Sequence, residues 1–90
     1  MKRHLEIKIF GKVQGVLFRA SAKKKAEELS LFGYAKNLTD GTVEIQAEGE
    51  RKDLDEFLKW CREGPDRASV ERVDFEFSDA ISGFEGFEIS

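Results

Sequence analysis

The sequence of 90 residues contains one cysteine, one proline and one histidine, and this scarcity narrows what the chain can be. The single cysteine, Cys61, cannot form an internal disulfide, and residues 1–6 lack the apolar stretch of a signal peptide. We therefore expect a cytoplasmic protein. Apolar runs are short and interrupted by charged residues throughout, so we expect no transmembrane helix and no membrane partner.

An excess of positive charge is absent as well. Fifteen Lys and Arg residues against eighteen Asp and Glu residues give a formal net charge of −3. Such a chain has no general attraction for nucleic acid or anionic lipid, so we expect neither as a partner. The histidine, His4, has no second metal ligand near it in the sequence, and we predict neither a metal site nor another cofactor.

Apolar side chains, in contrast, are plentiful. Hydrophobic residues make up 40% of the chain and eight of them are phenylalanine, which is enough to bury a core. Ninety residues suffice for one domain but not for a second domain and a linker. We therefore predict a single domain over residues 1–90, and a monomer.

Hydrophobic periodicity divides the chain into strands and helices. Leu5, Ile7 and Ile9 alternate with polar residues, as in a half-buried strand, whereas apolar residues at intervals of three and four predict helices. Glycines or the Gly64-Pro65 pair end several of these segments. The predicted elements are strands at about 5–10, 34–38, 42–48, 73–77 and 87–89, and helices at about 19–31 and 50–63.

Two local signals refine this outline. Asp40-Gly41 predicts a two-residue hairpin turn, and Val70 falls out of phase with the strand that follows it, which indicates a bulge or a bend. The order β-α-β-β-α-β is that of the split βαβ arrangement. We therefore predict an α+β, ferredoxin-like two-layer sandwich, with both helices packed on one face of an antiparallel sheet.

The segment from Gly11 to Arg19 joins the first strand to the first helix and contains no acidic residue. Unpaired N–H groups at a helix start, a tight backbone curl at Gly15 and the guanidinium of Arg19 can together bind a phosphate. It does not match the Walker loop, G-x-x-x-x-G-K-[ST]. Glycine spacing alone is equally compatible with an ordinary connection that carries a surface arginine.

The string Gly11-Lys12-Val13-Gln14-Gly15-Val16-Leu17-Phe18-Arg19 resembles the acylphosphatase signature G-x-V-Q-G-V-x-F-R and matches it at every fixed position. The resemblance continues through Asn37, through residues 40–44 and through Gly64-Pro65, and so covers nearly the whole chain. The chain departs from the common pattern at Ser30, where a glycine is frequent, and at residues 35–36.

This resemblance implies an enzyme that hydrolyses small-molecule acyl phosphates without a metal or a covalent intermediate. The catalytic roles would fall on Arg19, which holds the phosphoryl group, and on Asn37, which orients the attacking water. Inorganic phosphate would be a product and a competitive inhibitor. The loop that binds phosphate through its backbone N–H groups would comprise Gln14, Gly15, Val16, Leu17, Phe18 and Arg19. Without the resemblance, a turn asparagine beside Asp40-Gly41 would be the better interpretation of Asn37.

The chemistry of the residues agrees with these roles. Cys61 lies on the apolar stripe of the second helix, outside the anion loop, which argues against a cysteine nucleophile. A site with neither a metal nor a histidine acid suits a leaving group that departs without a proton. A carboxylate does so, because its conjugate acid has a pKa of roughly 4.

Two other kinds of domain, with different functions, have the same order of strands and helices. A non-catalytic binding module is one, because acylphosphatase-like domains also occur within larger carbamoyl-transferring proteins. An RNA-recognition domain is the other, but it displays aromatic side chains on its central strands, whereas Glu44 and Gln46 occupy the outward positions here. We expect Tyr34 to pack against the sheet.

Overall fold

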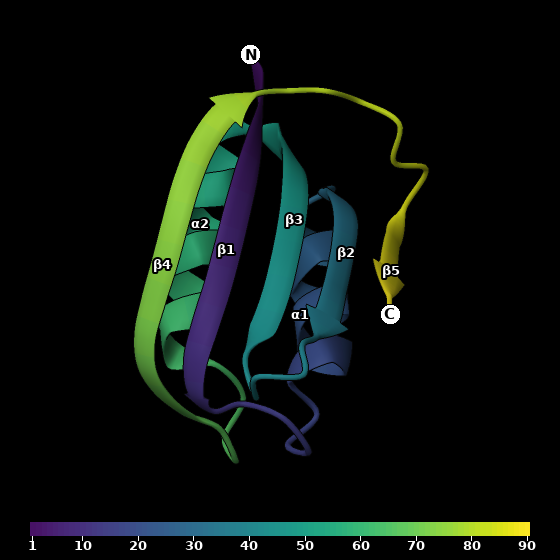
Figure 1. Ribbon diagram of the computed structural model, residues 1–90. Helices are drawn as coiled ribbons and strands as arrows, with labels where there is room; N and C mark the ends of the chain where they lie inside the picture. The colour runs from purple at the N-terminus through teal and green to yellow at the C-terminus, as the bar shows by residue number, and fades with distance from the viewer.

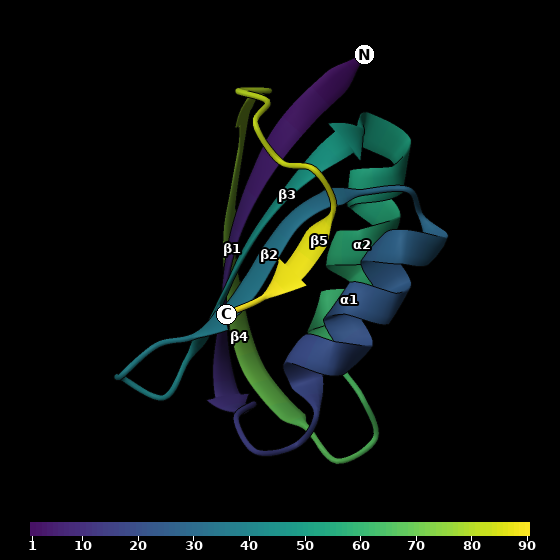
Figure 2. The same ribbon diagram turned by 90° about the vertical axis from the view of Figure 1, so that its right-hand side faces the viewer.

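The computed structural model describes residues 1–90 as one sheet of five strands with two helices on one of its faces (Figures 1 and 2). The elements in chain order are β1 (Lys2–Lys12), α1 (Phe18–Glu28), β2 (Phe32–Asn37), β3 (Val43–Glu50), α2 (Arg51–Glu63), β4 (Ser69–Asp79) and β5 (Phe87–Ile89). This confirms the predicted two-layer, ferredoxin-like α+β fold. Neither helix is long and apolar enough to cross a membrane.

The strands lie in the order β4-β1-β3-β2-β5. The first four pair antiparallel, but β5 pairs parallel with β2, Gly33 lying opposite Phe87. The predicted antiparallel sheet is therefore mixed, because its β2–β5 edge is parallel. The cause is visible in Figure 1: residues 80–86 carry the chain across the end of the sheet, so that β5 runs in the same direction as β2.

The core lies between the sheet and the two helices (Figure 2). Leu5, Ile7 and Ile9 are completely buried, which confirms the strand that their alternation predicts. The helical stripe that α2 turns to the sheet is also as predicted. Its buried residues are Leu54, Phe57, Leu58 and Cys61.

The connection between β2 and β3 differs from the prediction. Leu38 and Thr42 pair across it, with the Leu38 N–H donating to the Thr42 carbonyl at 2.9 Å, so the loop has three residues instead of two. Gly41, at φ +91°, takes the left-handed position that such a loop requires. Thr42 donates its N–H and its hydroxyl to the Asp40 carboxylate, which holds the turn closed.

The first strand is longer than predicted. Its pairing with β4 shifts between Phe10 and Gly11, leaving Glu71 as the extra residue of a bulge, and then continues to Lys12. The bulge inferred from the phase of Val70 is thereby confirmed. Helix α1 is shorter than predicted and ends at Glu28.

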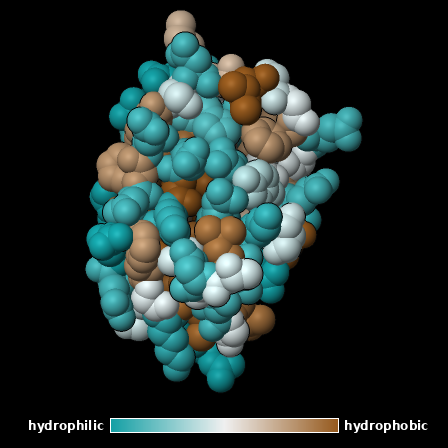
Figure 3. Space-filling view, viewed as in Figure 1, coloured by the Kyte–Doolittle hydropathy of each residue, from teal (hydrophilic) through white to brown (hydrophobic).

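The outer face of the sheet is mainly hydrophilic (Figure 3). Its central strands present Glu6, Glu44 and Gln46 outward, which is unlike the aromatic platform of an RNA-recognition domain. Tyr34 lies on this face and donates its hydroxyl to Glu44 at 3.0 Å. Partial burial, that hydrogen bond and the charges of Glu44 and Glu6 raise the pKa of Tyr34 to about 12.

The end of α1 carries a strained residue. The N–H of Leu31 donates to the Ala26 carbonyl at 2.8 Å and that of Ser30 to the Glu27 carbonyl at 3.1 Å, which is the Schellman pattern of helix termination. The pattern needs a left-handed residue after the helix, and Ser30 adopts φ +58°. This is the position at which a glycine is frequent in the acylphosphatase pattern that the sequence resembles.

Replacing Ser30 with glycine should therefore stabilise the protein. Glycine adopts the left-handed conformation without strain, which stabilises the folded state, but it also gives the unfolded chain more conformational freedom. The net effect should be an increase of about 0.5 to 1 kcal/mol in the free energy of unfolding. Thermal unfolding would show this as an increase of a few degrees in Tm. A matched Ser21→Gly change inside α1 should lower Tm, and an unchanged or lower Tm for Ser30→Gly would contradict the account.

Candidate active site

The loop between β1 and α1 is fastened to the core by its own apolar side chains. Val13 and Val16 are buried, which explains why this connection contains so many hydrophobic residues. Gly15, which lies between these two valines, and Leu17, which follows them, adopt left-handed backbone conformations, with φ of +74° and +63°. The backbone therefore curls tightly just before the helix begins.

The start of α1 is free of the groups that usually occupy a helix N-terminus. Leu17, the residue before the helix, makes no side-chain cap, and the first turn holds no acidic residue. The first helical hydrogen bond is donated by the N–H of Ser21 to the Leu17 carbonyl at 3.0 Å. The N–H groups of Phe18, Arg19 and Ala20 precede it and point with the positive end of the helix dipole toward any bound anion.

Arg19 lies in this first turn and contacts the opposite end of the chain. Its Nη1 donates a hydrogen bond of 2.8 Å to the carbonyl oxygen of Ser90, which directly follows β5. A guanidinium has five N–H donors, so this bond orients the group and leaves four donors for a ligand. The sequence contained no signal for the Ser90 contact, because the partners are 71 residues apart.

Asn37 is the last residue of β2. It pairs with the fully buried Val43, so its side chain lies on the helix-facing side of the sheet. Its Oδ1 is the one buried side-chain oxygen or nitrogen in the structure without a hydrogen-bond partner. Buried acceptors are nearly always paired, so an orphan atom of this kind indicates a position where a donor binds.

Arg19 and Asn37 line the same cavity, which has a volume of about 240 Å³. Figure 1 shows why they meet: β2 and β5 both run toward the end of the molecule at which α1 begins. Arg19 is the one charged residue in the lining, and Leu17 and Ile89 are exposed apolar residues there, with exposed fractions of 68% and 44%. The full lining is Val13, Gly15, Leu17, Phe18, Arg19, Ala20, Asn37 and Ile89.

Gln14 and Val16 belong to the predicted loop but do not line the cavity. Val16 points into the core, and the side-chain amide of Gln14 donates to the carbonyl oxygens of Leu38 at 2.8 Å and Thr42 at 2.9 Å. Gln14 thus ties the loop to the hairpin immediately after Asn37. Gln14 belongs to the predicted loop, but the sequence carries no signal for this clamp, because its partners are 24 and 28 residues away.

Cys61 and His4, for which the sequence predicts no catalytic or metal-binding role, lie outside this cavity. Cys61 is completely buried in the core, and burial raises the pKa of its thiol. His4 is buried on the other face of the sheet and donates to Glu48 at 2.7 Å. No group of three or more histidine, cysteine or acidic side chains is placed to hold a metal ion.

Comparison with known proteins identifies the family to which this site belongs. The family model described as Acylphosphatase matches residues 5–89, nearly the entire chain. The chain belongs to the acylphosphatase family. A relative named Acylphosphatase from Rubrobacter xylanophilus is 44% identical over 87 residues, which cover 97% of this chain and 79% of the relative.

Solved structures of acylphosphatases share the fold. The acylphosphatase from Coxiella burnetii has a TM-score of 0.92 and 40% identity, with 99% of this chain and 93% of that chain covered. The acylphosphatase from Bacillus subtilis has a TM-score of 0.94 and 33% identity, with 98% of each chain covered. The resemblance drawn from the loop motif is thereby confirmed.

The Gln14 clamp gives a testable consequence. Gln14→Ala removes two hydrogen bonds, those to the carbonyl oxygens of Leu38 and Thr42, which should lower the free energy of unfolding by about 1 to 2 kcal/mol. The freed loop should also bind inorganic phosphate several-fold more weakly, as measured by inhibition or by calorimetry. Arg72→Ala serves as the control, because Arg72 bonds Asp74 on β4, at the far edge of the sheet: it should affect stability only. Unchanged phosphate binding in Gln14→Ala would show that the clamp does not shape the loop.

Proposed function

We propose that this chain hydrolyses acyl phosphates to a carboxylate and inorganic phosphate, by direct attack of a water molecule on a phosphoryl group held by Arg19. One observation carries the proposal: the guanidinium of Arg19, the uncapped start of α1 and the unpaired Oδ1 of Asn37 all belong to one small cavity. Membership of the acylphosphatase family supports it.

The loop and Arg19 supply positive charge where phosphoryl transfer needs it. The transition state spreads negative charge over three equatorial oxygens. The N–H groups of the loop from Gln14 to Arg19 and the planar fork of the guanidinium stabilise that charge without rearranging during the reaction. Because Ser90 already orients Arg19, little freedom is lost when phosphate binds.

Asn37 supplies the position of the nucleophile. Its Oδ1 accepts a hydrogen bond from a water molecule and aims the lone pair of that water at phosphorus. The water oxygen forms a bond to phosphorus, the bond to the acyl oxygen breaks, and the carboxylate departs with the electron pair. The proton of the water passes to solvent, and no covalent enzyme intermediate forms.

The rim of the cavity suits the organic part of the substrate. Leu17 and Ile89 are exposed apolar residues beside the phosphate position, and a large apolar side chain held in a left-handed conformation, as at Leu17, costs stability. Both features are explained if the acyl group of a small-molecule substrate packs there. Inorganic phosphate, which lacks that group, is the product and a competitive inhibitor.

The remaining parts of the proposal concern the protein as a whole. Residues 1–90 act as one catalytic domain, as a monomer in the cytoplasm, and need neither metal nor other cofactor. The single cysteine supports the choice of compartment, because it offers no disulfide. Nucleic acid is not a partner, in keeping with the net charge of −3.

Arg19→Ala tests the phosphate-binding role. Loss of the guanidinium should reduce kcat/KM for benzoyl phosphate by about 10²-fold or more and weaken inhibition by inorganic phosphate in parallel. Arg62→Ala, an exposed arginine of α2 that stacks on Phe75, is the matched control and should leave both quantities unchanged. Phosphate inhibition that survives in Arg19→Ala would remove Arg19 from this role.

Asn37→Ala tests the water-positioning role separately. Turnover should fall by about 10²-fold, by analogy with the deletion of an oxyanion-hole donor, while the inhibition constant of inorganic phosphate changes little. Lys36→Ala is the control, because Lys36 is on the same strand with its side chain on the opposite face. If Asn37→Ala retains its turnover, the assignment of Asn37 is refuted.

A further inference from the structure

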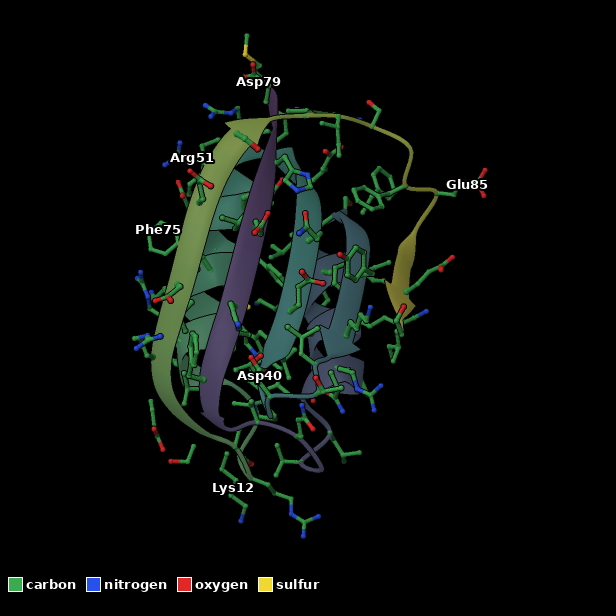
Figure 4. All side chains as sticks on the ribbon, viewed as in Figure 1. Lys12, Asp40, Arg51, Phe75, Asp79 and Glu85 are labelled. Carbon is green, nitrogen blue, oxygen red and sulfur yellow. The ribbon has the colours of Figure 1, made fainter.

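Residues 80–86 connect β4 to β5 by crossing the end of the sheet from one edge to the other (Figure 1). Figure 4 marks Asp79 at the start of this crossing and Glu85 on its descending part. The crossing passes β1, β3 and β2 and spans four strand spacings, or about 19 Å. The eight steps from Asp79 to Phe87 reach about 27 Å when fully extended. The connection therefore has little slack, and its path decides where β5 lies along β2.

One buried carboxylate holds this connection in its first half. Glu48, on the outer face of β3, accepts the N–H of Ile81 at 2.7 Å on Oε2 and that of Ser82 at 2.9 Å on Oε1. Burial raises the pKa of Glu48, but the hydrogen bonds from Ile81, His4 and Ser82 outweigh it and hold the pKa below its ordinary value. The carboxylate is thus stabilised in its ionised, hydrogen-bond-accepting form.

Two aromatic rings complete the attachment. His4, on β1, donates from Nδ1 to the same Oε2 of Glu48 at 2.7 Å, and its other ring nitrogen meets the side chain of Gln46. Phe84, on the connection, stacks on the His4 ring at 6.2 Å and leans against Tyr34 at 6.3 Å. We call His4, Glu48 and Phe84 the clasp, because they join the connection to the sheet.

Beyond the clasp, the chain leads directly to the active site. β5 pairs with β2 through three residue pairs, extended by a hydrogen bond from the Gly33 N–H to the Gly86 carbonyl at 2.9 Å. The carbonyl of Ser90 then accepts the hydrogen bond from Arg19. A slip of β5 by one residue would move Ser90 by about 3.3 Å and turn Ile89 out of the cavity lining. Phe87, buried against Phe57, and the Ser90 N–H, which donates to the Ala35 carbonyl at 2.9 Å, hold this register together with the connection that feeds so short a strand.

We propose that Glu48, fixed by His4, is a positioning residue that sets the register of β5 and thereby orients Arg19 for phosphate. The inference rests on the proposed role of Arg19 and adds a control point on the opposite face of the sheet. Glu48 touches neither substrate nor the cavity. It acts by determining the fraction of molecules in which Ser90 holds the guanidinium in place.

Glu48→Gln tests this, because it keeps the size of the side chain and removes its charge. The affinity of a site scales with the fraction of molecules that are competent to bind. KM for benzoyl phosphate and the inhibition constant of inorganic phosphate should rise together, by about fivefold, whereas kcat should change by less than about twofold. Glu50→Gln is the matched control: the exposed Glu50 carboxylate, two residues further along β3, binds the amino group of Met1 and should affect neither constant.

A merely structural role predicts something different. Suppose that the Glu48→Gln variant unfolds at a lower temperature and yet, at a temperature where it is still folded, has an unchanged KM and an unchanged inhibition constant for phosphate. That result would overturn the proposal. If that variant does not fold, Phe84→Ala removes the stacked ring without leaving a charge unpaired and should raise both constants in the same way; unchanged constants would again overturn it. Arg19→Ala that still binds phosphate would instead refute the proposed function, whatever Glu48→Gln shows.

Discussion

An uncapped helix start is the constraint on which the rest of this molecule depends. Three backbone N–H groups at the beginning of α1 have no side-chain cap and no acidic neighbour, and their residues line the cavity together with the curled loop before them. Leaving such groups without partners costs stability unless an anion or water satisfies them. The left-handed Leu17 and the unpaired oxygen of Asn37 are further costs at the same place, and all three are explained by one function.

The fold supplies what a single loop cannot. Arg19 comes from α1, Asn37 from β2 and the Ser90 carbonyl from the end of β5, and the strand order places all three at one end of the molecule. Gln14 fastens the loop to the hairpin, so that the loop and Asn37, which precedes the hairpin, keep a constant separation. Preorganisation of this kind is how a site without reactive side chains can accelerate a reaction.

Much of the fold was predictable because it follows from local periodicity. The alternation of Leu5, Ile7 and Ile9 and the apolar stripe of α2 identify buried faces without knowledge of partners. The resemblance to the acylphosphatase pattern likewise pointed to Arg19 and Asn37, which the structure brings into one cavity. The sequence predicts strand β5 but not its direction. The direction depends on the crossing made by residues 80–86, which the Glu48 carboxylate of β3 binds.

The features that the sequence did not predict depend on contacts between residues that are far apart in the chain. Nothing in the loop says that Gln14 bonds two carbonyls of a hairpin 24 and 28 residues away, or that Ser90 holds Arg19. The loop at Asp40-Gly41 has three residues, one more than predicted, because Leu38 and Thr42 pair across it. This pairing depends on both strands and not on the turn alone. Such interactions depend on tertiary structure, which periodicity alone does not specify.

Titration of the isotope-labelled protein with inorganic phosphate, followed by NMR of its backbone amides, tests the central claim most directly. We expect the largest chemical-shift changes at the N–H groups of residues 15–20, with saturation at the concentration that inhibits hydrolysis of benzoyl phosphate. Changes centred on another part of the chain, or none at all, would contradict the assignment of the helix start as the phosphate site.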